Sequence, residues 1–365
     1  MPNPTDLSLQ ASVLQALQTL VLPDGQGLTA DNGFVAAQQN GPVLRVELEM
    51  GYPLDTIGPA LAEQIRQVLA GLAPTIEVDL GWQAPSVQAT NKANVVPGVR
   101  NIIAVSSGKG GVGKSTTAAN LALALAKEGA RVGVLDADIY GPSQQQMLGV
   151  AGLRPKPYSA NVMTPIRTPH GLQMISMGNL ITKDTPVMWR GPMVSGALQQ
   201  LLRNVQWDDV DYLIIDMPPG TGDIQLTLAQ TVPVSGAVIV TTPQDIALLD
   251  AIKGVEMFRK VHIPVLGVVE NMSTHICSNC GHAEPIFGEA GGAKLAADYH
   301  VELLGQLPLQ LAIRQQTDAG TPPVAVDPES AVSLIYRRIA RNLAAALWAE
   351  SLAGDGMPEI TISDD

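Results

Sequence analysis

The sequence has few of the features that mark secreted or membrane-spanning proteins. Its 365 residues include two cysteines, three positions apart, so a disulfide framework is not expected. No apolar run is long enough to cross a bilayer. The first six residues also lack the positive segment and apolar core of a secretory signal. We therefore expect a soluble, cytoplasmic protein without a membrane partner.

Basic charge is also scarce, and the acidic charge is unevenly spread. The chain has 22 Lys and Arg against 34 Asp and Glu, which gives a formal net charge of −12. Residues 1–85 hold nine acidic and two basic residues, and residues 352–365 hold four acidic and no basic ones. Because no basic cluster is large enough to form a face, nucleic acid is not an expected partner.

The composition does supply enough apolar sequence for folded cores. Hydrophobic residues make up 46% of the chain and charged residues 15%, which is typical of globular proteins. A chain of this length can hold two domains. We predict a small α+β domain over 1–82, a polar linker over 83–97, a larger domain over 98–352, and an acidic, disordered tail over 353–365.

Apolar periodicity predicts the elements of the small domain. The predicted order is a helix at 7–22, strands at 34–38 and 43–50, a helix at 56–72 and a strand at 75–80. In 43–50 the apolar residues alternate with Arg45, Glu47 and Glu49, as in a strand with one buried face.

From residue 99 to about 349, predicted strands alternate with helices. The strands are expected near 101–106, 131–136, 210–216, 236–241, 264–270 and 301–304. Runs such as 212–215 and 237–240 are wholly apolar, which indicates parallel strands covered on both faces. This predicts an α/β fold with a doubly wound, mostly parallel sheet. The last helix, 330–352, carries Arg337, Arg338 and Arg341, and we expect them on a solvated face.

A phosphate-binding loop lies between the first of these strands and the helix at 116–128. The pattern G-x-x-x-x-G-K-[ST] is complete, and its residues are Gly108, Lys109, Gly110, Gly111, Val112, Gly113, Lys114, Ser115 and Thr116. Its glycines let backbone N–H groups face phosphate oxygens at the start of a helix. Lys114 is expected to reach the β- and γ-phosphates of ATP, and the Ser115 hydroxyl is expected to bind Mg²⁺.

Carboxylates follow two later strands of the predicted sheet. Asp136 and Asp138 lie at the strand end where ligands bind in α/β sheets, and Asp136 could help to hold the Mg²⁺ shell. Asp216 ends an apolar strand, the Walker B arrangement in which a carboxylate holds a magnesium-bound water. In the loop that follows, Gly220 could donate its N–H to the γ-phosphate, a contact that hydrolysis would remove.

The two cysteines form a C-x-x-C motif, Cys277 and Cys280. A zinc site or a cubane cluster needs four ligands, and the chain has no further cysteine. Three interpretations follow. His275 or His282 could complete a zinc site within one subunit. The pair could be a redox dithiol. Alternatively, two subunits could each give two thiolates to one shared 4Fe–4S cluster, because a two-fold axis duplicates the motif.

Five strings together resemble the Mrp/ApbC family of iron–sulfur cluster carriers, which are soluble phosphate-loop ATPases. They are G-K-G-G-V-G-K-S-T at 108–116, D-A-D-I-Y-G-P-S at 136–143, D-M-P-P-G-T-G-D at 216–223, V-E-N-M-S at 269–273 and the C-x-x-C motif. The first is also similar to the deviant Walker A motif of dimerising ATPases. The resemblance covers about residues 98–350.

This resemblance implies roles that the residues alone do not. Lys109 would reach the nucleotide of a partner subunit, Asp138 would help to activate the attacking water, and Asn271 would recognise adenine. Lys109, Lys114 and Asp138 would together form the catalytic set. The protein would be a homodimer that slowly hydrolyses ATP and binds a 4Fe–4S cluster between its subunits. It would receive clusters from assembly scaffold proteins and deliver them to apo iron–sulfur proteins.

Two other functions are compatible with the nucleotide motifs. A partitioning or positioning ATPase would act on DNA or a membrane, and it predicts a basic surface or a basic amphipathic helix at the C-terminus. This chain ends in acidic residues and carries the C-x-x-C motif, which favours the carrier. A nucleotide-regulated zinc protein is the third possibility.

The small domain predicted over 1–82 resembles the iron–sulfur-assembly domain that is often found in front of such carriers.

Overall fold

A computed structural model describes residues 4–22, 27–29, 32–87, 95–139, 141–179, 191–277 and 279–354. The chain divides into two compact units. The larger is Val87–Leu343, and the smaller combines Met1–Ser86 with Ala344–Asp365. Helix α11 (Ala331–Gly354) therefore contributes residues to both. Parts of the predicted linker and nearly all of the predicted acidic tail lie outside the described residues, and the proposed domain boundaries stay predictions.

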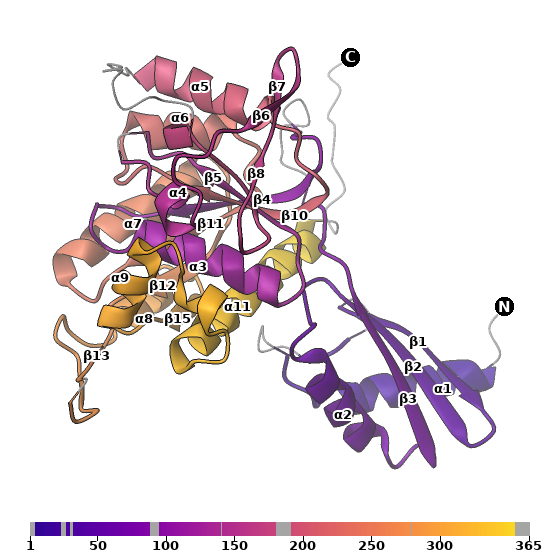
Figure 1. Ribbon diagram of the computed structural model, residues 1–365. Helices are drawn as coiled ribbons and strands as arrows, with labels where there is room; N and C mark the ends of the chain where they lie inside the picture. Colours follow the sequence, from indigo (N-terminus) through magenta and orange to yellow (C-terminus); the bar gives the residue numbers. More distant parts are fainter. Residues whose placement is uncertain are drawn as a thin grey trace, which may run out of the picture. The chain divides into compact units, whose positions relative to one another are not determined.

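An eight-stranded sheet forms the centre of the larger unit (Figure 1). Its spatial order is β15 (Leu303–Gln306), β12 (Val265–Glu270), β11 (Gly236–Thr241), β4 (Val99–Ser106), β10 (Val210–Asp216), β5 (Val132–Asp136), β9 (Gln173–Ser176) and β8 (Ile166–Arg167). All neighbouring pairs are parallel except β8 with β9. Every residue of β10 and β11 is buried, as expected for strands covered on both faces.

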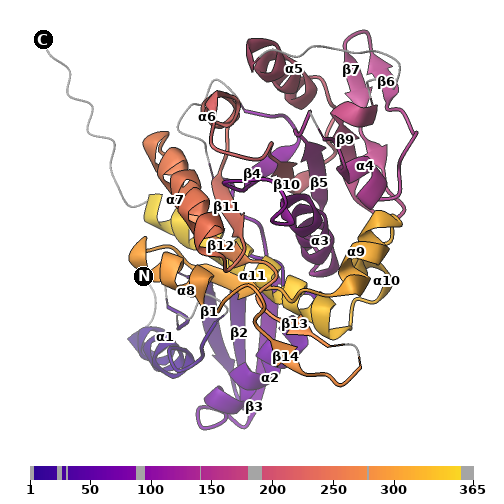
Figure 2. The same cartoon turned by 90° about the vertical axis from the view of Figure 1, so that its left-hand side faces the viewer.

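Helices cover both faces of this sheet (Figure 2). The chain crosses from β4 to β5 in one direction and from β10 through β11 and β12 to β15 in the other, and right-handed crossovers then place the connecting helices on opposite faces. The helices are α3 (Lys114–Lys127) and α4 (Gln144–Met147), then α5 (Gly191–Arg203), α6 (Asp223–Thr231), α7 (Asp245–Lys260) and α8 (Gly291–Asp298), and finally α9 (Leu311–Asp318), α10 (Pro323–Val326) and α11. The predicted doubly wound sheet is confirmed. The carboxyl ends of β4, β10 and β5 meet at one edge, which positions the candidate site.

The predicted strands differ from the structure mainly at the sheet margin. The strand expected at 301–304 is observed as β15 at Leu303–Gln306. β8 and β9 were not predicted, because 166–176 is short, contains polar residues and has no clear period. Two small hairpins complete the unit: β6 (Lys156–Ser159) with β7 (Val162–Thr164), and β13 (His275–Ile276) with β14 (Ala283–Glu284).

The expectation that Arg337 and Arg341 lie on a solvated face is wrong. Their side chains are 7% and 16% exposed, and both donate at 2.8 Å to Oε1 of Glu128, which is completely buried. Glu128 is the C-cap residue of α3, so these bonds attach α11 to the end of the helix that begins in the phosphate loop. Arg337 also contacts Glu329 and the Pro328 carbonyl oxygen.

The smaller unit is a three-stranded sheet with two helices. β1 (Phe34–Asn40) pairs antiparallel with β2 (Val43–Met50), which pairs parallel with β3 (Thr75–Trp82). α1 (Pro4–Leu17) and α2 (Gly58–Leu69) pack against this sheet. The end of α11 belongs to this unit, where Trp348 packs edge-on against Tyr52 with ring centroids 5.6 Å apart. The alternation predicted for 43–50 is confirmed.

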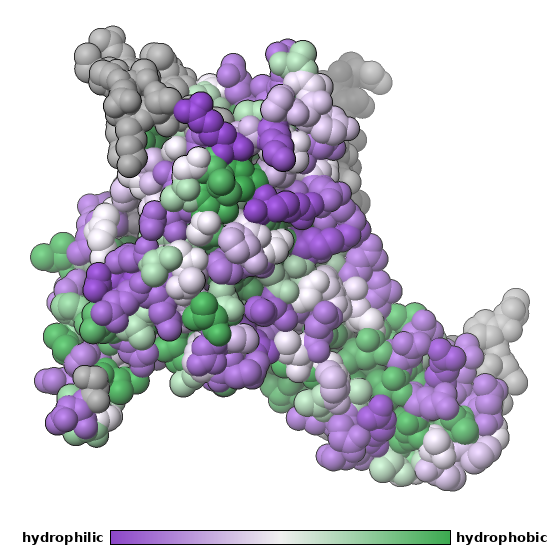
Figure 3. Space-filling model, in the orientation of Figure 1, coloured by the Kyte–Doolittle hydropathy of each residue, from purple (hydrophilic) through white to green (hydrophobic). Residues whose placement is uncertain are grey.

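The larger unit contains most of the helices in the described part of the chain. No helix within the described residues combines the length and the apolar character that a bilayer-spanning segment requires. On the face drawn in Figure 3, polar and apolar residues are interspersed over this unit.

The Glu128 network should contribute measurably to the stability of the larger unit. We expect Glu128→Ala to lower the free energy of unfolding by about 3 kcal/mol, because it leaves two poorly solvated guanidinium groups without their shared carboxylate. Urea unfolding followed by circular dichroism measures this change. The matched control is Arg314→Ala, which breaks the exposed Arg314–Asp318 pair and should cost less than about 1 kcal/mol. Equal losses in the two variants would contradict the prediction.

Candidate functional site

The phosphate loop joins the end of β4 to the start of α3 and presents unbonded backbone N–H groups. Gly111 and Gly113 both adopt φ of 83°, in the left-handed region that favours glycine. Within the described part of the chain, no hydrogen bond occupies the N–H groups of residues 109–113. α3 begins at Lys114, so its positive end faces the same space. The loop is therefore built to receive an anion such as a phosphate group.

Two of the loop glycines are also required by close packing. A Cβ at Gly108 would lie 2.1 Å from the carbonyl oxygen of Asp250 on α7. A Cβ at Gly113 would lie 2.1 Å from Nδ2 of Asn271. No larger residue fits at either position without moving its neighbour.

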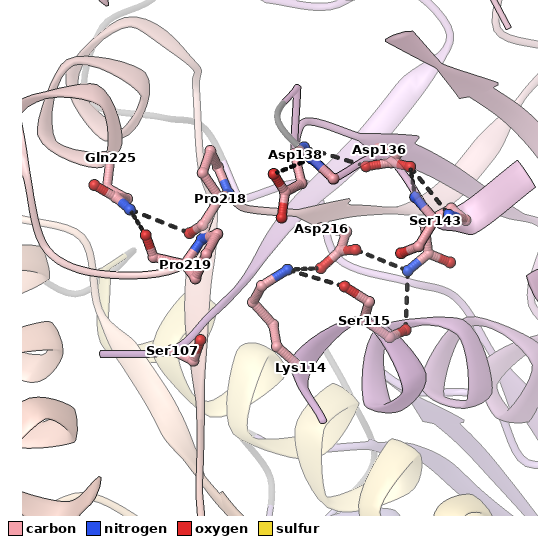
Figure 4. A network of polar contacts seen from close by, with 12 residues as sticks. Ser107, Lys114, Ser115, Asp136, Asp138, Ser143, Asp216, Pro218, Pro219 and Gln225 are labelled. Carbon is pink, nitrogen blue, oxygen red and sulfur yellow. Dashed lines mark hydrogen bonds and ion pairs between the residues drawn. The ribbon is translucent and has the colours of Figure 1, made fainter. Parts of the chain in front are cut away.

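Lys114 is held in a buried cluster at the centre of the site (Figure 4). Its ammonium pairs with Oδ1 of Asp216 and lies 3.2 Å from the Ser115 hydroxyl oxygen. The side chains of Lys114 and Asp216 are 5% and 0% exposed. Gln144 completes the cluster, since its Nε2 donates at 2.9 Å both to Asp216 Oδ2 and to the Ser115 carbonyl oxygen. The cluster thus joins the phosphate loop, β10 and α4.

Asp136 organises the chain that follows β5 rather than contacting Lys114. Its Oδ2 accepts the N–H groups of Ser143 and Gln144 and the Ser176 hydroxyl, and its Oδ1 accepts the N–H of Asp138. Burial, reinforced by the nearby charge of Asp216, raises the pKa of Asp136 to about 7. Asp136 therefore fixes the backbone from which the Gln144 side chain reaches the cluster.

Asp138 and the loop after Asp216 line a pocket of about 740 Å³. Asp138 accepts the N–H of Gly141 at 3.2 Å, and it shares the pocket with Pro218, Pro219 and Gln225. The Gln225 amide donates to the carbonyl oxygens of both prolines and so holds their loop (Figure 4).

Gly220 lies in the same loop, beside the end of β4. It has φ of 101°, and its N–H donates at 2.9 Å to the Ser107 carbonyl oxygen. A contact between this N–H and a γ-phosphate would have to exchange the Ser107 bond.

Lys109 lies within the phosphate loop, and Asn271 contacts that loop from the end of β12. Lys109 is partly exposed, and no ion pair joins it to any other described residue. Asn271 is 8% exposed and follows β12; its Nδ2 donates at 2.9 Å to the Val112 carbonyl oxygen, and its Oδ1 accepts the N–H of Met272. The two in-chain bonds leave this amide one N–H and one acceptor site.

Cys277 and Cys280 lie in the turn of the β13–β14 hairpin, which projects from the larger unit in both Figure 1 and Figure 2. The N–H of Cys277 donates to His282 O, and the N–H of Gly281 donates to Cys277 O, both at 2.9 Å. The backbone N–H groups of Cys280 and Asn279, with the Cys280 side chain, lower the pKa of the Cys277 thiol.

The hairpin does not assemble a complete metal site within the described chain. Among the described residues, no group of three or more His, Cys, Asp or Glu side chains could hold a metal. His275, one of the candidate zinc ligands, directs Nδ1 at 3.3 Å to the Leu309 carbonyl oxygen. Within the described residues, one chain therefore provides two thiolates as metal ligands at this hairpin.

The structure brings most of the predicted nucleotide residues together. Lys114, Ser115, Asp136, Asp138 and Asp216 meet at one sheet edge. Asn271 contacts Val112 within the phosphate loop, and Gly220 contacts Ser107 just before it. Gln144 and Ser176 belong to no motif and were not predicted to be site residues. The position of Gln144 directly after 136–143 is the one signal that could have drawn attention to it.

Comparison with known proteins identifies a family model over most of the larger unit. Residues 98–344 match the model described as ParA, NUBPL iron-transfer P-loop NTPase. The chain is 66% identical over 259 residues to an iron–sulfur cluster carrier protein of Pseudomonas fragi, which covers 70% of this chain and 90% of that one. It is 55% identical over 307 residues to the Escherichia coli K12 protein of the same description, covering 84% and 83%. The mouse iron–sulfur cluster transfer protein NUBPL is 51% identical over 254 residues, covering 69% and 79%.

Solved structures agree with these sequence matches. A nucleotide-binding protein from Archaeoglobus fulgidus, in complex with ADP and with cobalt found in it, has a TM-score of 0.56 and 36% identity, covering 64% of this chain and 92% of that one. The cell division ATPase MinD of Pyrococcus furiosus has a TM-score of 0.51 and 24% identity, covering 67% and 98%, which supports the fold alone.

The raised pKa of Asp136 predicts a specific pH dependence of stability. Because the folded pKa lies above the unfolded value, the folded protein binds the extra proton between about pH 4 and 7, and this stabilisation is lost as the pH rises through 7. Asp136→Asn cannot titrate. We expect the stability of wild type relative to this variant to fall by roughly 2 kcal/mol between pH 5 and 7. Urea unfolding at several pH values measures the difference, and parallel pH profiles would refute the assignment.

Proposed function

The chain belongs to the ParA-type family of NUBPL iron-transfer P-loop NTPases, and from this membership we propose that it is an ATP-dependent carrier of iron–sulfur clusters. The membership confirms the family resemblance drawn from the motifs. The observation that carries the proposal is the pairing of a buried Lys114–Ser115–Asp216 cluster with a hairpin that offers two thiolates. The buried residues around Lys114 would bind the nucleotide of such a carrier, and the hairpin would bind its iron–sulfur cluster.

ATP would bind at the free N–H groups of the phosphate loop. Lys114 would then exchange its bond with Asp216 for bonds to the β- and γ-phosphates. Its ammonium lies 3.2 Å from the Ser115 hydroxyl oxygen, at the start of α3 where those phosphates would bind. The second N–H and the second acceptor site of the Asn271 amide suit the donor and acceptor edge of adenine.

The oxygen groups at the site fit a magnesium ion. The Ser115 hydroxyl and the Asp216 carboxylate are hard ligands, and Oε1 of buried Gln144 has no hydrogen-bond partner among the described residues. Ser115 would hold Mg²⁺ directly and Asp216 through water, and the ion would neutralise charge on the phosphates. Asp138, facing the pocket beside Pro218 and Pro219, would orient the attacking water.

Gly220 would report the nucleotide state. Its N–H bonds to Ser107 in this structure, and a γ-phosphate would offer a stronger, charged acceptor. Exchange of that bond would move the loop that Gln225 holds, and hydrolysis would restore it.

The cluster would be a 4Fe–4S cluster shared by two subunits. One chain supplies two thiolates, so a second copy would complete the four ligands. The lowered pKa of the Cys277 thiol favours the thiolate that binds metal. A zinc site within one subunit receives no support from the geometry of the described residues, because no third ligand joins the pair.

The face beside the phosphate loop suits a dimer. Lys109 is without an ion-pair partner among the described residues, as a cation that reaches another subunit's nucleotide would be. On α7, which packs against Gly108, Ile246 and Leu249 are 70% and 60% exposed. Burial of these side chains against a second copy would stabilise the association.

Apo iron–sulfur proteins would accept the cluster, scaffold proteins would supply it, and the cytoplasm is the proposed location. The alternative, a partitioning or positioning ATPase, predicted a basic helix at the C-terminus. Arg337 and Arg341 are instead engaged by Glu128, so α11 offers little basic surface there. This observation favours the carrier.

Cys277→Ala or Cys280→Ala should each abolish stable cluster binding and leave ATP binding intact. Two ligands per chain leave no spare thiolate, while the nucleotide site contains neither residue. Anaerobic reconstitution, visible absorption and iron, sulfide and zinc analysis provide the measurement, with nucleotide binding as the control. A single mutant that keeps a normal 4Fe–4S spectrum would contradict the shared site. Stoichiometric zinc in the native protein would favour the zinc interpretation.

Lys109→Ala should affect cluster transfer more than ATP affinity. One charge-assisted hydrogen bond contributes at most about 1.5–3 kcal/mol, and less where it is exposed, so ATP affinity should stay within about an order of magnitude. Its larger effect should appear in the ATP-dependent part of cluster transfer to an acceptor protein. Transfer rates with and without ATP in both proteins test this. An unchanged ATP response would rule out the role across subunits.

A further inference from the structure

A segment of seven residues connects a phosphate-loop contact to the cysteine hairpin. It begins at Asn271, whose amide bonds to Val112 and packs against Gly113, and it reaches Cys277. The candidate nucleotide site and the candidate cluster site are therefore joined by a short, continuous piece of backbone.

This segment contains a strained residue next to the phosphate-loop contact. Met272 adopts φ of 58°, a left-handed conformation that is a genuine outlier for a bulky residue. Its N–H is held by Oδ1 of Asn271, the same amide that bonds to Val112. Strain of this kind persists only where surrounding bonds impose it, and it is concentrated at switch regions.

The backbone on either side of Met272 is firmly attached. Before it, buried Glu270 accepts the N–H of Gly292 and the Gln306 amide. After it, Ser273 bonds to the Leu307 carbonyl through both its N–H and its hydroxyl, and Leu309 donates to Thr274. Any rearrangement in this segment is therefore concentrated at the Asn271–Met272 step.

We propose that the Asn271–Met272 step transmits the nucleotide state of the phosphate loop to the C-x-x-C hairpin. This inference rests on the proposed function. A nucleotide that engages Asn271 or moves Val112 changes the two amide bonds that hold Met272 in its left-handed conformation. The backbone from Ser273 to Cys277 then shifts as one piece together with residues 307–309, to which Ser273, Thr274 and His275 are bonded, and this shift alters how the two thiolates are presented. Asn271 and Met272 are positioning residues in this scheme.

The test uses the reactivity of the cysteine thiols, because the chain has no others. Full-length, cluster-free protein is alkylated anaerobically with iodoacetamide, with and without a saturating non-hydrolysable ATP analogue. The analogue should change the rate of Cys277 and Cys280 modification by about fivefold or more. Met272→Gly relaxes the strained conformation and should reduce this response to less than about twofold while the analogue still binds.

His262→Gly is the matched control, because His262 adopts φ of 57° in the turn before β12, away from the hairpin. It should keep the wild-type response. If Met272→Gly fails to fold, Met272→Asn serves in its place, since asparagine tolerates the same φ. A response in the folded Met272 variant equal to wild type overturns the proposal, as does wild-type protein that binds the analogue without any change in thiol reactivity. Failure of wild type to bind the analogue contradicts the proposed function itself.

Discussion

The ion pair between Lys114 and Asp216 is the constraint on which the site depends. Both side chains are almost fully removed from water, and a buried ammonium is tolerable only beside an opposite charge with its remaining bonds satisfied. That requirement forces the phosphate loop and the end of β10 together, and the Gln144 amide binds the second carboxylate oxygen. The Lys114 ammonium thus already lies at the position where phosphate charge is expected. Exchange of one anion for another at this position avoids the cost of desolvating the lysine anew.

Much of this arrangement could be predicted, because it is encoded in contiguous strings. The loop at 108–116 and the carboxylates at strand ends are local patterns, and the topology of a parallel sheet brings strand ends together. Contacts between distant residues could not be predicted in the same way. Glu128 and Arg337 lie 209 positions apart, and nothing near either residue indicates the other. Gln144 was missed for a related reason: its role depends on the direction of one side chain. β9 was missed because its burial comes from its neighbours and not from its own period.

The cysteine hairpin contrasts with the nucleotide site in how it is stabilised. β13 and β14 have two residues each, and both β14 residues are exposed. Few buried contacts oppose its opening, so it belongs to the low-stability end of the fold. Its bases are firm, however, since Glu270 and Ser273 attach the backbone at its start to α8 and to residue 307. A weakly stabilised tip on a firm base suits the proposed cluster site, which would have to hold a cluster and also release it.

Helix α11 has a consequence for how the polypeptide matures during synthesis. Residues from Ala344 onward belong to the compact unit of Met1–Ser86, and Trp348 covers Gly51 and Tyr52 there. The first 86 residues leave the ribosome long before Trp348 is made. Their sheet therefore lacks the packing of Trp348 on Tyr52 until the whole larger unit has been translated. The earliest part of the chain to emerge is the last to be completed, and a ribosome that stalls before residue 344 releases a first domain that lacks part of its core.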